Sequence, residues 1–320
     1  MATPRILITR ALPQQVVDAV AAFAEVSVNR DMSAYRSDDA AMAMISYDGI
    51  MPTLGDNFGP TAFRSALDIR CKIIANVGVG YNHIDVAAAH RRGVVVTNTP
   101  GAVTDATADV AMMLLLSVAR RGAEGDRLIR AGNWNEWHPM FMLGTHVTGK
   151  RLGIIGMGGI GRALAKRAHF GFDMEILYYN RSTVDCGIPG ARQVATLEEV
   201  MAGSDFVSVH LPGGDATRHI MNAEILSHAR RGAILINTAR GDVVDEAALI
   251  AALKSGQLAG AGLDVFESEP HVPEALRAME NVVLTPHTGT SSLEVRLAMM
   301  MMAVENLRAF FAGEPVPNPV

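Results

Sequence analysis

Short apolar runs alternate with amphipathic segments along the whole chain. A first series of runs, rich in Val and Ile, occupies residues 5–9, 25–29, 48–53, 72–78 and 94–98. A second series occupies residues 151–156, 175–180, 206–210, 233–238, 261–265 and 282–286. Short β-branched strands separated by helical segments are typical of parallel sheets covered on both faces. The pattern predicts an α/β protein with two doubly wound parallel-sheet domains.

Two longer helical segments bear on how these domains are connected. The first half of residues 104–133 is apolar on every face, which predicts a helix buried all round. The last segment, 291–314, is followed by no further domain, so we expect it to pack back on the first series. The first domain would then be discontinuous, formed by residues 1–99 and 288–320, with residues 100–287 inserted as the second.

Composition and charge narrow the class of protein. The chain has 320 residues, 49% of them hydrophobic, and a formal net charge of −5, so it carries no basic footprint for nucleic acid. The longest apolar run, 111–116, is too short to span a membrane, and the amino terminus leads directly into a strand. Cys71 and Cys186 have no metal-ligand spacing. We therefore expect a soluble cytoplasmic protein with buried thiols and no metal, nucleic-acid or membrane partner.

A glycine-rich turn points to a dinucleotide. The sequence GMGGIG follows the strand at 151–156 and opens a helix, which is the context that dinucleotide binding requires. The diphosphate then lies on free N–H groups at the amino end of that helix. The predicted cofactor contacts are Gly156, Met157, Gly158, Gly159, Ile160 and Gly161.

The end of the next strand bears on which dinucleotide is bound. An NAD-binding chain usually has an acidic residue there, which accepts hydrogen bonds from the adenosine ribose. This chain instead has Asn180, Arg181, Ser182 and Thr183. A guanidinium and two hydroxyls suit the 2′-phosphate of NADP, so we expect NADPH to be preferred. The alternative is that Arg181 is a solvated surface residue and NADH is also accepted.

Several motifs together resemble one enzyme family. INTARGDVVDEAAL (236–249), AGLDVFESEP (261–270) and LTPHTGT (284–290), following GMGGIG, resemble the D-isomer-specific 2-hydroxyacid dehydrogenases. NVGVGYNHID (76–85), NTPGAVTDATADVA (98–111) and WHPMFMLG (137–144) resemble its glyoxylate/hydroxypyruvate reductase branch. The resemblance implies a Rossmann cofactor domain inserted into a substrate domain. It also implies hydride transfer that reduces glyoxylate or hydroxypyruvate to glycolate or D-glycerate.

The resemblance also implies a catalytic triad of side chains. Arg240 would bind the substrate carboxylate and polarise the keto oxygen. His287 would exchange the proton as acid and base, because imidazole titrates near neutrality. Glu269 would hold the imidazole and stabilise its cationic form.

Further contacts are implied by the same resemblance. The substrate would also meet the backbone of Val77 and Gly78, and Trp137 would cap the pocket of a neighbouring subunit in a homodimer. Thr107 would lie beside the cofactor, although a place in a helix core suits it almost as well. The remaining expected cofactor contacts are His210, Pro212, Thr238, Ala239, Asp264 and Gly289, with Asp264 receiving the nicotinamide carboxamide.

The chain departs from the family pattern at two places. Gly213 and Gly214 stand where Leu-Thr is commoner, which predicts a looser loop beside the cofactor. Thr288 stands where the family more often has Ile, which predicts an extra hydroxyl near the nicotinamide. Neither departure removes a catalytic group.

Two other functions remain open on the sequence alone. One is an NAD-linked dehydrogenase of D-lactate or phosphoglycerate type. The other, from a different class, is an NAD(P)H-sensing protein similar to a corepressor, because such proteins can retain the catalytic residues. Turnover of a 2-keto acid by the purified protein separates an enzyme from a sensor.

Overall fold

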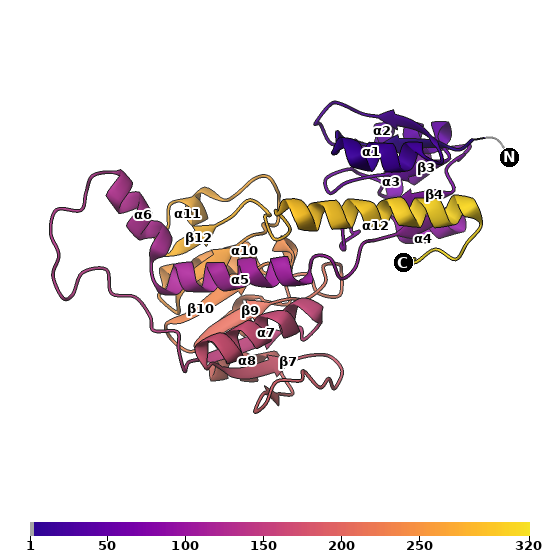
Figure 1. The fold of residues 1–320 in the computed structure, drawn as a ribbon. Helices are drawn as coiled ribbons and strands as arrows, with labels where there is room; N and C mark the ends of the chain where they lie inside the picture. Colours follow the sequence, from indigo (N-terminus) through magenta and orange to yellow (C-terminus); the bar gives the residue numbers. More distant parts are fainter. Residues whose placement is uncertain (1–2) are drawn as a thin grey trace. The chain divides into compact units, whose positions relative to one another are not determined.

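The computed structural model describes residues 3–320 and divides the chain into two compact units (Figure 1). Residues up to Val103, together with Ser292–Val320, form unit 1, and Thr104–Ser291 form unit 2. From the sequence, the domain boundaries are expected between residues 99 and 100 and between residues 287 and 288.

Unit 1 is built on a five-stranded sheet with the order β2-β1-β3-β4-β5. Every neighbouring pair is parallel. Its strands are β1 (Arg5–Ile8), β2 (Glu25–Val28), β3 (Gly49–Met51), β4 (Ile73–Ala75) and β5 (Val95–Thr97). Each lies within a predicted run, and the apolar side chains of all but the edge strand β2 are mostly buried.

Five helices cover that sheet on its two faces. They are α1 (Gln14–Ala21), α2 (Ser37–Ser46), α3 (Pro60–Ser65), α4 (Val86–Arg91) and α12 (Leu293–Ala312). One apolar cluster joins α1 and α12 to the sheet, and a second joins α2, α3 and α4 to it. The carboxy-terminal helix thus belongs to the same unit as the first strands, as its position at the end of the chain predicts.

Unit 2 is built on a seven-stranded parallel sheet with the order β12-β11-β10-β9-β6-β7-β8. Its strands are β6 (Arg151–Ile155), β7 (Glu175–Tyr179), β8 (Arg192–Gln193), β9 (Phe206–Val209), β10 (Ala233–Asn237), β11 (Leu258–Leu263) and β12 (Val282–Leu284). The order confirms the predicted α/β class with a doubly wound parallel sheet. Strand β8 is an addition that no apolar run signals.

The helices of unit 2 also pack on both faces of their sheet, except for the second in chain order, none of whose residues is buried. They are α5 (Thr104–Ala119), α6 (Gly122–Arg130), α7 (Gly159–Phe172), α8 (Leu197–Gly203), α9 (Ala223–Ser227), α10 (Glu246–Lys254) and α11 (Glu274–Arg277), with a 3₁₀ turn at Gly241–Val243. Helices α5 and α7 lie side by side and share one apolar cluster (Figure 1), while α8, α9 and α10 share the other.

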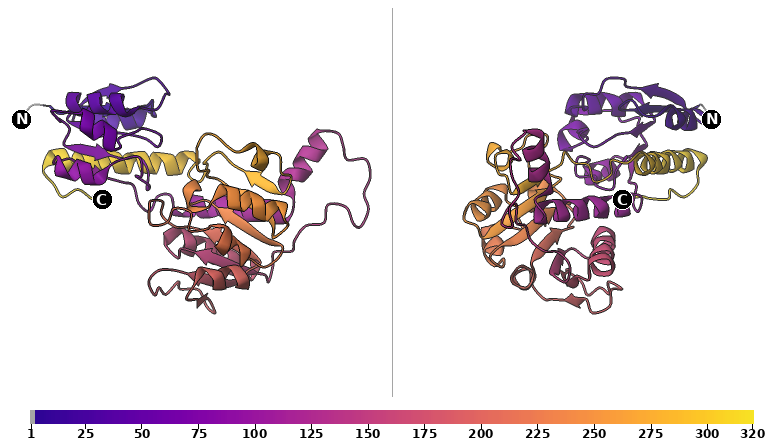
Figure 2. Two further views of the ribbon diagram at one scale, coloured as in Figure 1. Left: turned by 180° about the vertical axis from the view of Figure 1, so that it is seen from behind. Right: turned by 60° about the vertical axis from the view of Figure 1, so that its left-hand side comes forward.

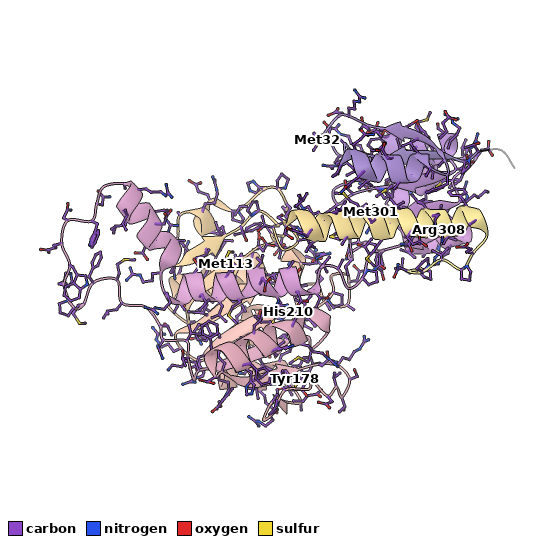
Figure 3. All side chains as sticks on the ribbon, in the orientation of Figure 1. Met32, Met113, Tyr178, His210, Met301 and Arg308 are labelled. Carbon is purple, nitrogen blue, oxygen red and sulfur yellow. The ribbon has the colours of Figure 1, made fainter. Side chains whose placement is uncertain are left out.

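Within this chain one stripe of α5 is exposed, and burial of that stripe in a subunit interface stays a prediction. Asp105, Asp109 and Met113 follow one another at helical spacing on its outer side, and Met113 is 46% exposed (Figure 3). The two carboxylates pair with Arg167 on α7 at 3.0 and 2.6 Å. This stripe is exposed because its acidic residues face solvent, although the apolar composition of the helix had suggested complete burial.

Helix α6 and residues 131–143 form an arm that projects from the body of unit 2 (Figures 1 and 2). The chain returns to the body at Thr145, whose N–H donates to the carbonyl oxygen of Ala119 at 2.7 Å. The arm carries exposed large apolar side chains at Ile129, Trp134, Trp137, Met140 and Leu143. In the described part of the chain, no helix is long and apolar enough to cross a membrane.

Candidate active site

The residues expected to act on the substrate gather at one edge of the unit 2 sheet. Strands β9, β10, β11 and β12 run parallel, so their carboxyl ends share an edge. Arg240 follows β10, Glu269 follows β11 and His287 follows β12. Open α/β sheets bind their ligands at this edge.

Glu269 and His287 form the central contact of the site. Glu269 Oε2 lies 2.8 Å from His287 Nδ1, and Glu269 Oε1 accepts the backbone N–H of Phe266 at 3.0 Å. Burial by itself would raise the pKa of Glu269, but the hydrogen bond and charge of His287, with the charge of Arg240, lower it below its usual value. An ionised carboxylate only accepts hydrogen bonds, so Nδ1 carries the proton and Nε2 is left to meet a ligand.

The turn that carries His287 is anchored by Asp264. Asp264 is buried, and its Oδ1 accepts hydrogen bonds from the hydroxyl of Thr285 at 2.6 Å and from the backbone N–H of Thr288 at 2.7 Å. Its Oδ2 accepts the N–H of Gly289 at 2.8 Å. His287 itself has a φ of 52°, an uncommon left-handed conformation for a residue with a side chain. Asp264 therefore stabilises a strained turn at a reactive residue.

Thr288 and Thr107 also belong to this anchor. The Thr288 hydroxyl, expected near the nicotinamide, donates to Asp264 Oδ1 at 3.0 Å. The Thr107 hydroxyl on α5 donates to the carbonyl oxygen of Gly289 at 3.3 Å, and the side chain is buried. Contact of Asp264, Gly289 and Thr107 with the cofactor stays a prediction.

Arg240 presents a guanidinium with little internal bonding. Its Nη1 donates to the carbonyl oxygen of Ala239 at 2.6 Å, and it forms no ion pair with any residue from 3 to 320. Burial lowers the pKa of Arg240, against the opposing charges of Glu269 and Asp242. Asn237 holds the turn by donating to the Arg240 carbonyl at 2.9 Å and accepting the Ala239 N–H at 3.0 Å. A half-buried cation without a carboxylate partner is a site for an anionic ligand.

A reciprocal pair that the sequence reasoning missed ties the Arg240 loop to the Glu269 loop. Glu246 N–H donates to Glu267 Oε1 at 2.9 Å, and Glu267 N–H donates to Glu246 Oε1 at 3.0 Å. Between the loops, a Cβ added at Gly241 would overlap the backbone of Phe266. Glu246 and Glu267 lie inside the ARGDVVDE and DVFESEP motifs, but sequence separation gives no signal that they exchange hydrogen bonds.

The glycine-rich turn fits a dinucleotide. Gly156 has a φ of 98°, and a Cβ there would lie 2.7 Å from the carbonyl oxygen of His210. A Cβ at Gly161 would overlap the carbonyl oxygen of Gly156, so only glycine permits the close packing of α7 on β6. Around Gly158 there is open space, and no described side chain caps the amino end of α7. The free N–H groups of Gly159, Ile160 and Gly161 suit a diphosphate.

The strand end at Asn180 is linked to this turn. Asn180 Oδ1 accepts the N–H of Met157 at 3.2 Å, and its Nδ2 donates to the Ser182 hydroxyl at 3.2 Å. Arg181, Ser182 and Thr183 are exposed, and Arg181 forms no ion pair within residues 3–320. From the sequence, we expect these groups to bind the 2′-phosphate of NADP.

His210 and Thr238 carry polar atoms that no described residue satisfies. His210 lies just past β9 (Figure 3), and its Nε2 is 2.9 Å from the Ser208 hydroxyl. Its buried Nδ1 and the buried Thr238 hydroxyl have no hydrogen-bond partner among residues 3–320. Burial lowers the pKa of His210 to about 4, so the ring is neutral near pH 7. Buried unsatisfied groups beside a glycine-rich turn are consistent with a polar ligand.

The loop after His210 is held more firmly than its glycines predict. The Thr217 hydroxyl donates to the carbonyl oxygen of Pro212 at 2.6 Å and to that of Gly214 at 3.1 Å. The Thr217 hydroxyl thus closes this turn, and the looser loop expected from the two glycines stays a prediction.

The expected substrate contacts of unit 1 differ in availability. The N–H of Val77 donates to the carbonyl oxygen of Pro52 at 3.0 Å, so it is not free for a carboxylate. No residue from 3 to 320 accepts the N–H of Gly78, and Asn76 Nδ2 holds the loop by donating to the carbonyls of Gly78 and Gly80 at 3.0 and 3.1 Å. Gly78 is thus the better candidate of the two.

Comparison with known proteins decides the family. Residues 112–289 match the D-isomer specific 2-hydroxyacid dehydrogenase, NAD binding domain. The chain is also 44% identical over 320 residues to a glyoxylate reductase of Korarchaeum cryptofilum, covering 99% of this chain and 96% of that protein. The chain belongs to the D-isomer-specific 2-hydroxyacid dehydrogenase family.

Solved structures agree with this membership. The enzyme superimposes on a protein from Thermus thermophilus with a TM-score of 0.91 and 42% identity, covering 99% of each chain. It superimposes on an NADPH-dependent glyoxylate/hydroxypyruvate reductase from Sinorhizobium meliloti, in complex with NADP and malonate, with a TM-score of 0.87 and 35% identity. That match covers 100% of this chain and 97% of the other. The predicted family and fold class are confirmed.

Proposed function

We propose that this enzyme reduces glyoxylate and hydroxypyruvate with a preference for NADPH. The observation that carries the proposal is the unpaired guanidinium of Arg240 close to the Glu269–His287 pair. Its charge lowers the pKa of Glu269, so the cation lies within electrostatic reach of the acid–base pair. A 2-keto acid offers both groups that such a site recognises, a carboxylate and an adjacent carbonyl. The relatives named glyoxylate reductase support the choice of small keto acids.

Each side chain has a defined part in the reduction. Arg240 binds the substrate carboxylate and polarises the keto oxygen. A bound nicotinamide dinucleotide supplies the hydride. His287 Nε2 gives the proton that converts the keto oxygen to a hydroxyl, and Glu269 keeps the resulting imidazole oriented through Nδ1. Orientation and charge stabilisation provide most of the acceleration.

The preference for NADPH follows from the strand end at Asn180. An acid at this position would repel a 2′-phosphate, whereas Asn180 is neutral and uses its amide on Met157 and Ser182. Arg181 is exposed and free of internal ion pairs in the described chain, so its charge is available to the phosphate. The Sinorhizobium meliloti relative, a structure with NADP, supports this cofactor.

Substitution of Arg181 tests the cofactor proposal. The Arg181→Ala variant should lose at least about tenfold in kcat/KM with NADPH, equivalent to about 1.4 kcal/mol. Its kcat/KM with NADH should stay within about twofold of the wild-type value. Arg192→Ala, on the exposed end of β8, is the matched loss of one surface cation and should change the ratio less. Equal losses with both cofactors in Arg181→Ala would remove the phosphate assignment.

We also propose that the enzyme is a homodimer that uses the arm of unit 2. Trp137 is 73% exposed in this arm, and Met113 on α5 adds a further exposed apolar side chain. A concentration of large apolar groups on a projecting segment is unusual for a monomer. Light scattering should report about twice the 34.1 kDa of one chain. A single-chain mass at assay concentrations would reject the dimer and, with it, contact of Trp137 with a neighbouring subunit's site.

A further inference from the structure

Gln193 uses its whole side-chain amide on one loop. Its Nε2 donates to the carbonyl oxygens of Asn180 at 3.2 Å and Ser182 at 2.9 Å, and its Oε1 accepts the N–H of Val184 at 3.1 Å. A glutamine amide has two donors and one carbonyl acceptor, so all three parts are engaged. Gln193 comes from β8, the edge strand that is paired with β7 through Tyr178. A short strand at the end of the sheet thus supplies one clamp for the loop 180–184.

Two further side chains hold the same loop. Asn180 Nδ2 donates to the Ser182 carbonyl oxygen at 3.1 Å, and the Tyr178 hydroxyl donates to the Val184 carbonyl oxygen at 2.6 Å. The carbonyls of Asn180, Ser182 and Val184 are therefore all bound within the unit. These acceptors are not left facing an anion, while the side chains of Arg181 and Thr183 remain exposed.

Holding the backbone while the side chains stay exposed matters for binding, because a mobile exposed loop loses conformational freedom when it binds a ligand. Each side chain that must be ordered at an interface costs about 0.5–1.5 kcal/mol. A loop whose backbone is already held in one arrangement avoids much of that cost. The interactions that hold it need not touch the ligand.

We propose that Gln193 is a positioning residue for selectivity between phosphorylated and unphosphorylated dinucleotides. It holds the backbone at 180–184 so that Arg181, Ser182 and Thr183 are arranged for a 2′-phosphate before the cofactor arrives. The inference rests on the proposed preference for NADPH. It adds that this preference depends on a side chain in a different strand, which does not itself contact the phosphate.

The test substitutes Gln193 by methionine, which has a similar length but neither donates nor accepts strongly. Binding of NADPH and of NADH is measured by titration, with kcat/KM for glyoxylate measured with each cofactor. In Gln193→Met, affinity for NADPH should fall by about tenfold while affinity for NADH changes by less than about twofold. The kcat at saturating NADH should stay at the wild-type value. A role in stability alone would weaken both cofactors equally.

Gln257 offers a matched control in the same unit. Its Nε2 also donates to two backbone carbonyls, those of Ser227 and Ala229, but this loop precedes β10 and so lies at the amino ends of the strands. Gln257→Met should lower the melting temperature to a similar degree and leave the NADPH/NADH ratio unchanged. A changed ratio in Gln257→Met would mean that loss of any loop clamp alters selectivity, and would overturn the proposal.

The outcomes separate this inference from the proposed function. If the wild-type enzyme shows no preference for NADPH, the proposed function fails and Gln193 has no selectivity to set. If Arg181→Ala abolishes a preference that Gln193→Met retains, the inference alone fails. Should Gln193→Met not fold, Gln193→Leu removes the same hydrogen bonds in a shorter apolar side chain and is judged by the same ratio.

Discussion

Glu269 Oε2 and His287 Nδ1 are 2.8 Å apart, although the two residues are 18 positions apart on loops that follow different strands. The contact depends on β11 and β12 being neighbours in parallel register, which brings their carboxyl ends together. It leaves Nε2 as the ring nitrogen that can exchange a proton with a ligand. The His287 side chain is 27% exposed, so a small molecule can reach it.

His287→Ala should remove the proton donor and leave the dinucleotide site intact. General acid–base catalysis contributes about 10²–10⁴-fold, so kcat for keto-acid reduction should fall within that range. Affinity for NADPH should change little, because the glycine-rich turn is unaltered. Steady-state kinetics and a binding titration on the same preparation check both parts. Near-native turnover would remove the acid–base assignment.

Glu269→Gln should change the pH profile of reduction. The pKa of Glu269 is lowered by His287 and Arg240 despite burial, so the carboxylate stays ionised through the neutral range. Glutamine can still accept a hydrogen bond from Nδ1 but does not balance the charge of an imidazolium. The alkaline decline of kcat/KM should therefore occur at lower pH in the variant. An unshifted profile would argue that Glu269 orients the ring without stabilising its charge.

The lowered pKa of Glu269 also makes the stability of the fold depend on pH. Because the folded pKa of Glu269 is below the unfolded one, its contribution is complete above the unfolded pKa. That contribution is lost as the pH falls through the folded pKa.

Arg240→Lys should separate charge from geometry. Lysine keeps the positive charge but lacks the planar fork that grips a carboxylate with two hydrogen bonds. The KM for the keto acid should rise by about tenfold or more, with a smaller change in the KM for NADPH. Arg230→Lys, at an exposed ion pair with Asp205, is the control and should behave as wild type. A keto-acid KM that is unchanged in Arg240→Lys would contradict the carboxylate role.

His210 should make the fold sensitive to mild acid. Burial lowers its pKa to about 4 in the folded chain, against about 6.5 when unfolded. Between these values the unfolded chain binds more protons, so stability falls as the pH decreases from 6.5 to 4, by up to about 1.4 kcal/mol per pH unit. His210→Asn cannot titrate and should show a shallower fall in urea midpoint between about pH 7 and pH 5. Parallel curves would show that His210 is not buried in its neutral form.

Most strands were predictable because runs of apolar β-branched residues indicate strands that are buried in a sheet. Strand β8 was not, since Arg192 and Gln193 have no apolar periodicity and the strand exists only through pairing with Leu177 and Tyr178. The exposed stripe on α5 was also missed. The helix as a whole has an apolar composition. The ion pairs that its two aspartates form with Arg167 depend on the neighbouring helix α7.

The site divides in a similar way. Arg240, Glu269 and His287 lie in motifs at strand ends, so the topology of a parallel sheet predicts that they meet at one edge. Other contacts join a side chain to backbone atoms of another segment, and no residue type or spacing indicates such partners. They involve Glu246, Glu267 and Gln193. The occupied N–H of Val77 is of the same kind, because its acceptor, Pro52, follows a different strand.

The proposed function is tested most directly by kcat/KM of the wild-type enzyme for glyoxylate and for hydroxypyruvate, each with NADPH and with NADH, on one preparation. We expect turnover of both acids and at least about tenfold higher kcat/KM with NADPH, corresponding to about 1.4 kcal/mol. A preference for NADH would contradict the role given to Arg181 and favour an NAD-linked dehydrogenase. No turnover of either acid with either cofactor would contradict the proposed reductase function.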